Sequence, residues 1–310
     1  MKPVPGPATA RLTGTPQTVR VNAFLALVAI LGVSASGPLM AGASAPALAI
    51  GFWRNALGTL AVAPFAAPRA RGELGALGRD GWRATFFAGV MLAAHFGTWV
   101  TALKMTSVAA ATAMVSMQVV FVVVIDRLRG EAAPRSVVAG MGLAIVGVLV
   151  ITGVDFSLST RALTGDLLAL VGGLTAALYL IAGSQVRERV STSSYTVACY
   201  GICAVTLALA CRVAQVEMVD FSGRTWLAII GVTICAQLLG HSVLNHLLAV
   251  MSPGLISLLL LLEVPGAAIL AGIFLDQTPP LGVYVGLALI LAGLIVVVIR
   301  RPPPEPTLAD

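Results

Sequence analysis

Charged residues are scarce in this chain. Only 10% of its 310 residues are Asp, Glu, Lys or Arg, whereas about a quarter are charged in an average soluble domain. Residues 225–299 carry just two formal charges, Glu263 and Asp276. The hydrophobic fraction is 58% and the mean hydropathy is +0.97. This composition excludes an ordinary soluble domain and predicts an integral membrane protein.

Cysteines are also few, and a nucleotide-binding motif is lacking. The four cysteines lie in or at the ends of apolar segments, where cysteine acts as a small hydrophobe and does not build a disulfide framework. No His or carboxylate joins Cys199 and Cys203 to complete a metal site, and no Walker A sequence is present. We therefore expect no metal and no cofactor. The net charge of +6 is scattered between apolar segments, so we also expect no nucleic-acid partner.

Apolar segments long enough to cross a bilayer recur along the chain. A hydrocarbon core of about 30 Å needs about 20 apolar residues in a helix. Pro and Gly divide the two longest apolar runs, near residues 42–46 and 251–254. The predicted fold is an all-α integral membrane protein with ten transmembrane helices, at 21–40, 46–66, 82–103, 107–125, 136–153, 165–186, 193–211, 226–248, 253–275 and 280–299.

The distribution of Lys and Arg predicts the orientation. Cytoplasmic loops of membrane proteins carry an excess of these residues. With a cytoplasmic N-terminus, fourteen fall on the cytoplasmic side and four on the other side, namely Lys104, Arg161, Arg212 and Arg224. We expect a multi-pass plasma-membrane protein with both termini in the cytoplasm. The stretch AGASA at 41–45 is similar to a signal-peptide cleavage site, but cleavage would leave nine helices, so we expect the first helix to be retained.

The second half of the chain repeats the first. WRATFFAGVMLAAHFG, from Trp82, is similar to WLAIIGVTICAQLLGHS, from Trp226, and at a constant offset Gln118 aligns with Glu263. Each half contains five predicted helices, so the second half enters the membrane from the opposite side. Such inverted repeats are typical of secondary transporters that bind substrate near the membrane midplane.

Two aligned segments resemble a known family. MQVVFVVVIDRLRGE, from Met117, and LLEVPGAAILAGIFLDQ, from Leu261, are similar to the fourth and ninth helices of the EamA-like family in the drug/metabolite transporter superfamily. Glu263 matches the Glu of that family's LEP-V motif, whereas Pro265 is displaced by one position. The resemblance implies repeats at 21–153 and 165–299, a connecting loop at 154–164, cytoplasmic tails at 1–20 and 300–310, and export of small metabolites, amino acids or drugs.

Ionisable side chains at membrane depth are the first site candidates. A charged group at the centre of a membrane helix costs about 2.5 to 3.5 kcal/mol on insertion scales, which singles out Glu263. Its place in the family motif leaves open a purely architectural role. Arg54 lies near the middle of the second predicted helix. It is expected either to pair with Glu263 or to receive an anionic substrate.

Three polar residues mark the eighth predicted helix. Gln237, His241 and Asn245 recur every four residues, which places them on one face of an α-helix. Such a face cannot contact lipid cheaply. It either lines a cavity or makes hydrogen bonds between helices.

The first half offers a matching set. His95 aligns within one residue of His241, so two imidazoles are expected to frame a central site. Trp99, Gln118 and Tyr179 are further candidates, as hydrogen-bonding groups and aromatic walls.

Three classes of function remain. A secondary transporter working by alternating access accounts for the ten helices, the repeat and the buried polar groups. A passive channel or receptor would need a polar face repeated around the bundle, and an intramembrane or lipid-modifying enzyme would need a Ser/His dyad or clustered carboxylates. We therefore expect a transporter without enzymatic activity, with a small-molecule substrate and the lipid bilayer as partners; a homodimer stays open.

Overall fold

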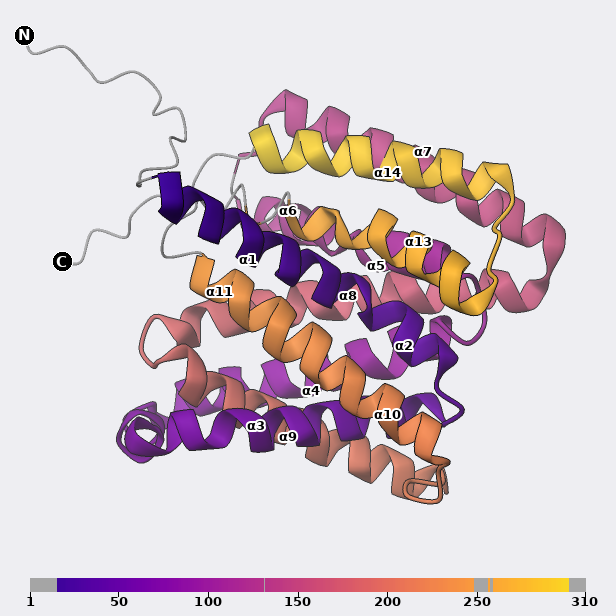
Figure 1. The fold of residues 1–310 in the computed structure, drawn as a ribbon. Helices are drawn as coiled ribbons and strands as arrows, with labels where there is room; N and C mark the ends of the chain where they lie inside the picture. Colours follow the sequence, from indigo (N-terminus) through magenta and orange to yellow (C-terminus); the bar gives the residue numbers. More distant parts are fainter. Residues whose placement is uncertain (1–15, 131, 248–255, 257–258, 301–310) are drawn as a thin grey trace, which may run out of the picture.

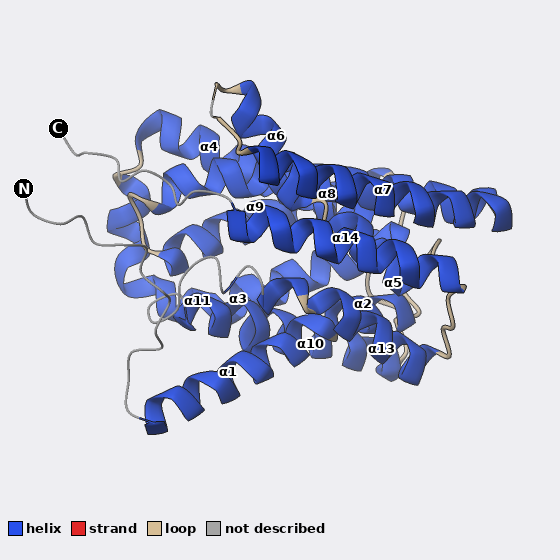
Figure 2. Cartoon of the chain, turned by 90° about the horizontal axis from the view of Figure 1, so that it is seen from above, coloured by secondary structure: helices blue, strands red, loops and turns tan. Residues whose placement is uncertain are grey.

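The computed structural model describes residues 16–130, 132–247, 256 and 259–300 (Figure 1). In this part of the chain the regular structure is entirely helical. The helices run side by side between two ends of a bundle, and the start of the first helix and the end of the last lie at the same end (Figures 1 and 2). We call this the terminal end and the opposite one the distal end.

The first half comprises α1 (Pro16–Ser34), α2 (Ser36–Gly42), α3 (Ala47–Gly75), α4 (Gly78–Ala102), α5 (Val108–Val115), α6 (Gln118–Leu128) and α7 (Arg135–Leu158). The second half comprises α8 (Thr160–Arg187), α9 (Thr192–Val213), α10 (Gly223–Val232), the π-helix η1 (Thr233–Ser242), α11 (Val243–Leu247), α13 (Glu263–Leu275) and α14 (Leu281–Arg300).

Eight helical spans are long and apolar enough to cross a membrane, counted over the described residues. A ninth apolar helix, Leu259–Leu275, is shorter. The helix α3 is 29 residues long, but its last turns carry Arg69, Arg71 and Glu73, and it is not among the eight. The expected break at 251–254 lies outside the described residues.

Three boundaries differ from the sequence-based expectation. The segment 154–164, expected to be a loop, is helical except at Ser159, whose Oγ accepts the backbone N–H of Ala162 at 3.0 Å and caps α8. The helix α1 already begins at Pro16, inside the expected tail 1–20. Residues 233–242 form a π-helix where an α-helix was expected.

The helices pack in pairs that correspond between the two halves. The helix α7 packs along α14 at one edge of the bundle, and α3 packs along α9 at the opposite edge (Figure 1). In between, α4 packs on α8, and η1, its counterpart in the second half, packs on α1. When the two halves are exchanged, the α7–α14 and α3–α9 pairs map onto themselves, and the α4–α8 pair maps onto the η1–α1 pair. The packing is therefore approximately two-fold symmetric.

Hydrogen bonds tie α3 to the second half at both ends of the bundle. At the distal end, Nε1 of Trp53 donates to the carbonyl of Met218 at 2.5 Å. At the terminal end, the Glu73 carboxylate accepts the Ser191 hydroxyl at 2.6 Å and the Ser191 backbone N–H at 3.0 Å. The hydrogen bond from the Ser191 hydroxyl lowers the pKa of Glu73 below its usual value.

Backbones approach closely where α7 meets α14. A Cβ added to Gly147 would lie 2.5 Å from the carbonyl oxygen of Gly286, and one added to Gly140 would lie 2.7 Å from that of Gly293. The approximate symmetry that maps α7 onto α14 also maps one of these contacts onto the other. Apolar side chains gain little by leaving lipid for one another, so close backbone packing at small residues is a main source of helix association in membranes.

This contact between α7 and α14, which we call the α7–α14 seam, yields a prediction about stability. Gly147→Leu forces the α7 and α14 backbones apart, and overpacking of this kind costs about 1 to 3 kcal/mol. Gly142→Leu on the same helix is the matched control, because a Cβ at Gly142 meets nothing within 4 Å. Thermal unfolding of both purified variants should show a lower midpoint for Gly147→Leu alone. Equal midpoints would mean that the seam does not stabilise the bundle.

Candidate functional site

The fourth helix of each half is interrupted at the same aligned position. In the first half α5 ends at Val115 and α6 begins at Gln118. In the second half α13 begins at Glu263, after a turn at Leu262. Gln118 and Glu263 are the residues that the sequence repeat aligns. Both halves thus place a polar side chain at the first residue of a new helical segment.

A buried polar face lies on α3. Gly51, Arg54, Asn55 and Gly58 follow helical spacing and are all buried. Arg54 is 3% exposed and Asn55 is fully buried. Nδ2 of Asn55 donates to the Gly51 carbonyl at 2.8 Å, while its Oδ1 has no partner. We did not single out Asn55 from the sequence, although a second polar residue beside Arg54 in an apolar segment was a usable signal.

Neutral groups surround the Arg54 guanidinium. Nη1 donates to Oγ of Ser36 at 3.2 Å and lies 3.8 Å from Sδ of Met40, both on α2. Its central carbon lies 4.6 Å from the centre of the Phe96 ring on α4, in a cation–π contact. Nε is buried without a hydrogen-bond partner. The side chain therefore joins three helices while one of its donors stays unused.

Arg54 and Glu263 interact electrostatically but do not form an ion pair. An ion pair is present at the exposed Arg83–Asp80 contact at 3.3 Å, but none joins Arg54 to Glu263. Glu263 is half-buried and lies within electrostatic range of Arg54. The alternative in which the two side chains pair directly is not realised. The helix packing does not bring their charged atoms within bonding distance.

The structure gathers several predicted residues around Arg54. His95 of α4 and His241 of η1 both lie within electrostatic range of Arg54, and His241 also lies within range of His95. Tyr200 of α9 lies within range of Arg54 as well. We call Arg54, His95, Tyr200, His241 and Glu263 the central cluster. It combines two residues of the first half with three of the second.

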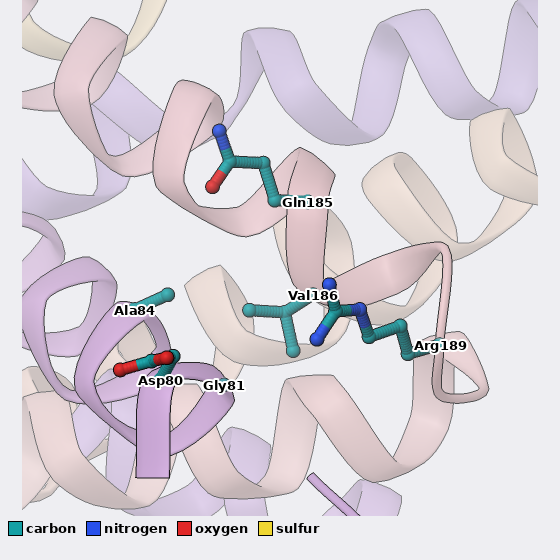
Figure 3. A pocket seen from close by; sticks show the side chains of 6 residues that line it. All are labelled: Asp80, Gly81, Ala84, Gln185, Val186 and Arg189. Carbon is teal, nitrogen blue, oxygen red and sulfur yellow. The ribbon is translucent and has the colours of Figure 1, made fainter. Parts of the chain in front are cut away.

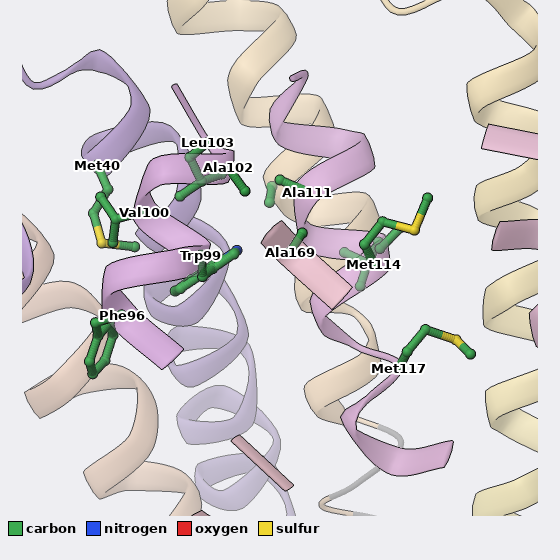
Figure 4. Close-up of a cluster of buried hydrophobic side chains, with 14 of the residues drawn as sticks. Met40, Phe96, Trp99, Val100, Ala102, Leu103, Ala111, Met114, Met117 and Ala169 are labelled. Carbon is green, nitrogen blue, oxygen red and sulfur yellow. The ribbon is translucent and has the colours of Figure 1, made fainter. Parts of the chain in front are cut away.

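His95 also links α4 to α8. Its Nδ1 lies 3.0 Å from the carbonyl oxygen of Gly172, and its ring stacks on Trp99 with the centres 5.4 Å apart. Phe96 and Trp99 project from α4 among buried apolar side chains of both halves (Figure 4). Nε1 of Trp99 is buried without a partner. After Nε of Arg54 on α3, the indole N–H on α4 is thus a second unused donor.

Two predicted site residues lie beside the central cluster. Tyr179 of α8 is half-buried and interacts electrostatically with Tyr200 and Tyr195 of α9. Gln118 is half-buried at the start of α6, and its backbone N–H lies close to Gly173 of α8.

The polar residues of the eighth predicted helix do not share one environment. Gln237 is 4% exposed, and its amide packs directly on Gly58 of α3. The side chain of His241 is exposed, and that of Asn245 lies outside the described residues. Hydrogen bonds from i to i+5 give η1 more residues per turn than the α-helix assumed from the sequence. Because it is buried and its amide packs on Gly58, Gln237 is a packing residue in this conformation.

Two hollows lie at the terminal end. One of about 80 Å³ lies between α4 and the end of α8 (Figure 3) and is lined by Asp80, Gly81, Ala84, Gln185, Val186 and Arg189. The other, of about 440 Å³, is shallow and is lined by Arg79, Trp82, Arg83 and Phe86. Neither includes a residue of the central cluster.

The eight apolar spans of the described residues define a multi-pass membrane protein. The sequence matches the EamA-like transporter family over residues 21–153 and 163–299, one match for each half. The chain belongs to this family and is therefore a membrane transporter of the drug/metabolite type, as its resemblance implied.

Solved structures share the fold, among them the following one. It is titled "Crystal structure of protein", is 21% identical and superposes with a TM-score of 0.61, over 92% of this chain and 99% of that one. A search of curated proteins gave no significant match.

The contrast between Gln237 and His241 can be tested by stability. Gln237→Ala leaves a gap against Gly58, so we expect a loss of roughly 0.5 to 3 kcal/mol. His241→Ala removes an exposed ring and should stay within about 0.5 kcal/mol of the wild type. Thermal unfolding in detergent, followed by size-exclusion fluorescence, measures both. A larger loss for His241→Ala than for Gln237→Ala would contradict the burial pattern.

Proposed function

We propose that the protein is a secondary transporter that exports small molecules by alternating access. Its ten helices form two inverted repeats, 21–153 and 165–299, in the plasma membrane, with both termini in the cytoplasm. The observation that carries the proposal is the central cluster. It brings charged and titratable groups of both halves together at mid-depth, where isolated charges are costly.

The ten spans follow from adding two helices to the eight apolar ones. The first 21 residues of α3, up to Ala67, carry a single charged residue, Arg54, and are long enough to cross. Leu259–Leu275 is apolar over 17 residues and begins next to undescribed residues. The exchange of helix pairs and the aligned interruptions at Gln118 and Glu263 support the inverted repeat.

Alternating access would move one half against the other around the central cluster. In inverted-repeat transporters, interrupted helices lie at the substrate site because their ends expose backbone groups that can bind it. Here the interruptions carry Gln118 and Glu263, which we propose as substrate-contacting residues. His95, His241, Trp99 and Tyr179 would form the polar and aromatic surroundings, and Arg54 would supply the positive charge.

Flux through proteoliposomes tests this function directly. Liposomes containing the purified chain are loaded with a defined mixture of amino acids, nucleosides, organic acids and amines, and the retained solutes are compared with protein-free liposomes. Saturable, protein-dependent loss of particular solutes is expected. Loss of every small solute in proportion to its concentration would indicate a passive channel, and no protein-dependent loss would contradict transport.

Glu263→Gln tests the role of the central carboxylate. Glu263 has no ion pair to break, so the amide should leave the fold and the unfolding midpoint near wild type. A hydrogen bond to a charged group contributes about 1.5 to 3 kcal/mol, so transport should fall about tenfold or more. Asp276→Asn is the control, because Asp276 is exposed at the distal end of the same helix. Unchanged transport in Glu263→Gln would mean that Glu263 has only an architectural role.

Cysteine labelling tests the orientation. Thr160 lies exposed at the distal end, and Glu188 lies exposed at the terminal end. In intact cells an impermeant thiol reagent should label Thr160→Cys and should label Glu188→Cys only after permeabilisation. The native cysteines, three of which are buried, give the background. The opposite pattern would place the termini outside.

A further inference from the structure

We propose that the Nε–Nη2 edge of Arg54 binds the carboxylate of a monoanionic substrate. The inference rests on the proposed transport function and specifies the class of solute that the central cluster accepts.

The argument begins with the hydrogen-bond donors of the guanidinium. An arginine side chain offers five N–H donors in a planar fork. In Arg54, Nη1 is occupied by Ser36 and Met40. Nε has no partner, and Nη2 makes no hydrogen bond to the described residues. The edge formed by Nε and Nη2 is the one that a carboxylate grips with two parallel hydrogen bonds.

The charge balance points the same way. Arg54 is 3% exposed, and its direct contacts are a hydroxyl, a thioether and an aromatic ring, all of them neutral. A buried charge is costly unless an opposite charge and hydrogen bonds compensate for it. Glu263 is the acidic member of the central cluster, but it is not paired with Arg54. A bound carboxylate would provide the missing counter-charge at the free edge.

Neighbouring groups narrow the ligand further. Phe96 and Trp99 of α4 add aromatic surface near Arg54, and Nε1 of Trp99 is an unused donor. Arg54 supplies a single positive charge, so a second carboxylate of the ligand would lie there without a counter-charge. The site therefore favours one carboxylate attached to an apolar or aromatic body over a dianion.

A structural role is the competing explanation. Arg54 could serve only to join α2, α3 and α4 through Ser36, Met40 and Phe96. In that case its replacement would lower stability without changing any selectivity for ligand charge. The test therefore has to measure a charge-specific response.

Three probes of nearly equal shape separate the two explanations. The full-length protein in lipid nanodiscs is heated with 3-phenylpropionate, 3-phenylpropionamide or 3-phenylpropylamine, which are anionic, neutral and cationic. A ligand that binds the folded state raises the unfolding midpoint in proportion to its occupancy. We expect a rise with the carboxylate alone. Equal shifts from all three probes, or no shift from the carboxylate, would overturn the proposal.

Variants assign the response to Arg54. The carboxylate-induced shift should disappear in Arg54→Gln and should need at least tenfold more ligand in Arg54→Lys, which keeps the charge but loses the fork. Arg212→Gln is the control, because Arg212 is exposed at the end of α9. If Arg54→Gln does not fold, an unchanged carboxylate affinity in Arg54→Lys would overturn the proposal. So would a shift that persists in a folded Arg54→Gln.

The inference and the transport function can fail separately. Carboxylate-selective binding without saturable flux in proteoliposomes would contradict the transport function and support the anion site. Saturable flux of neutral or cationic solutes, unaffected by Arg54→Gln, would leave transport and remove the anion site.

Discussion

A positive charge buried in a membrane protein is the constraint around which the centre of this structure is organised. Lipid offers no solvation to the Arg54 guanidinium, so neighbouring helices must provide it. The helix α2 contributes Ser36 and Met40, and α4 contributes the Phe96 ring. The second half contributes favourable electrostatic interactions from Tyr200 and Glu263. The remaining donors of Arg54 make this solvation incomplete, and an incompletely solvated charge is suited to a ligand that comes and goes.

The edges of the bundle meet a different physical demand. Apolar side chains are as well solvated by lipid as by one another, so helices associate through close contact and hydrogen bonds. The α7–α14 seam uses glycines whose backbones touch, and hydrogen bonds of Trp53 and Glu73 join α3 to residues just after and just before α9. Each of these pairs maps onto itself when the halves are exchanged. In the proposed mechanism they are therefore natural hinges, because motion about them leaves their own contacts unchanged.

The sequence predicted what depends on periodicity and charge. Apolar runs located the helices, and the alignment of the halves brought His95 and His241 to one place, near Arg54 and Glu263. It missed features that depend on packing between distant segments. Nothing local in the sequence predicted the π-helix at 233–242, and the burial of Gln237 depends on the absence of a side chain at Gly58. The expected loop at 154–164 failed because Ser159 alone suffices to cap α8.

The two halves share a backbone plan but not a charge pattern. At the offset that aligns Gln118 with Glu263, Arg54 falls on Cys199, so neither charge of the central cluster has a charged counterpart in the other half. An inverted repeat can reach two opposite-facing states by exchanging the conformations of its halves. If both halves carried the same charges, the two states would have about the same electrostatic energy. Because the first half holds the cation and the second half the anion, moving the halves apart separates opposite charges. A substrate carboxylate at Arg54 would lower the energetic cost of that separation, which couples ligand binding to the change of state.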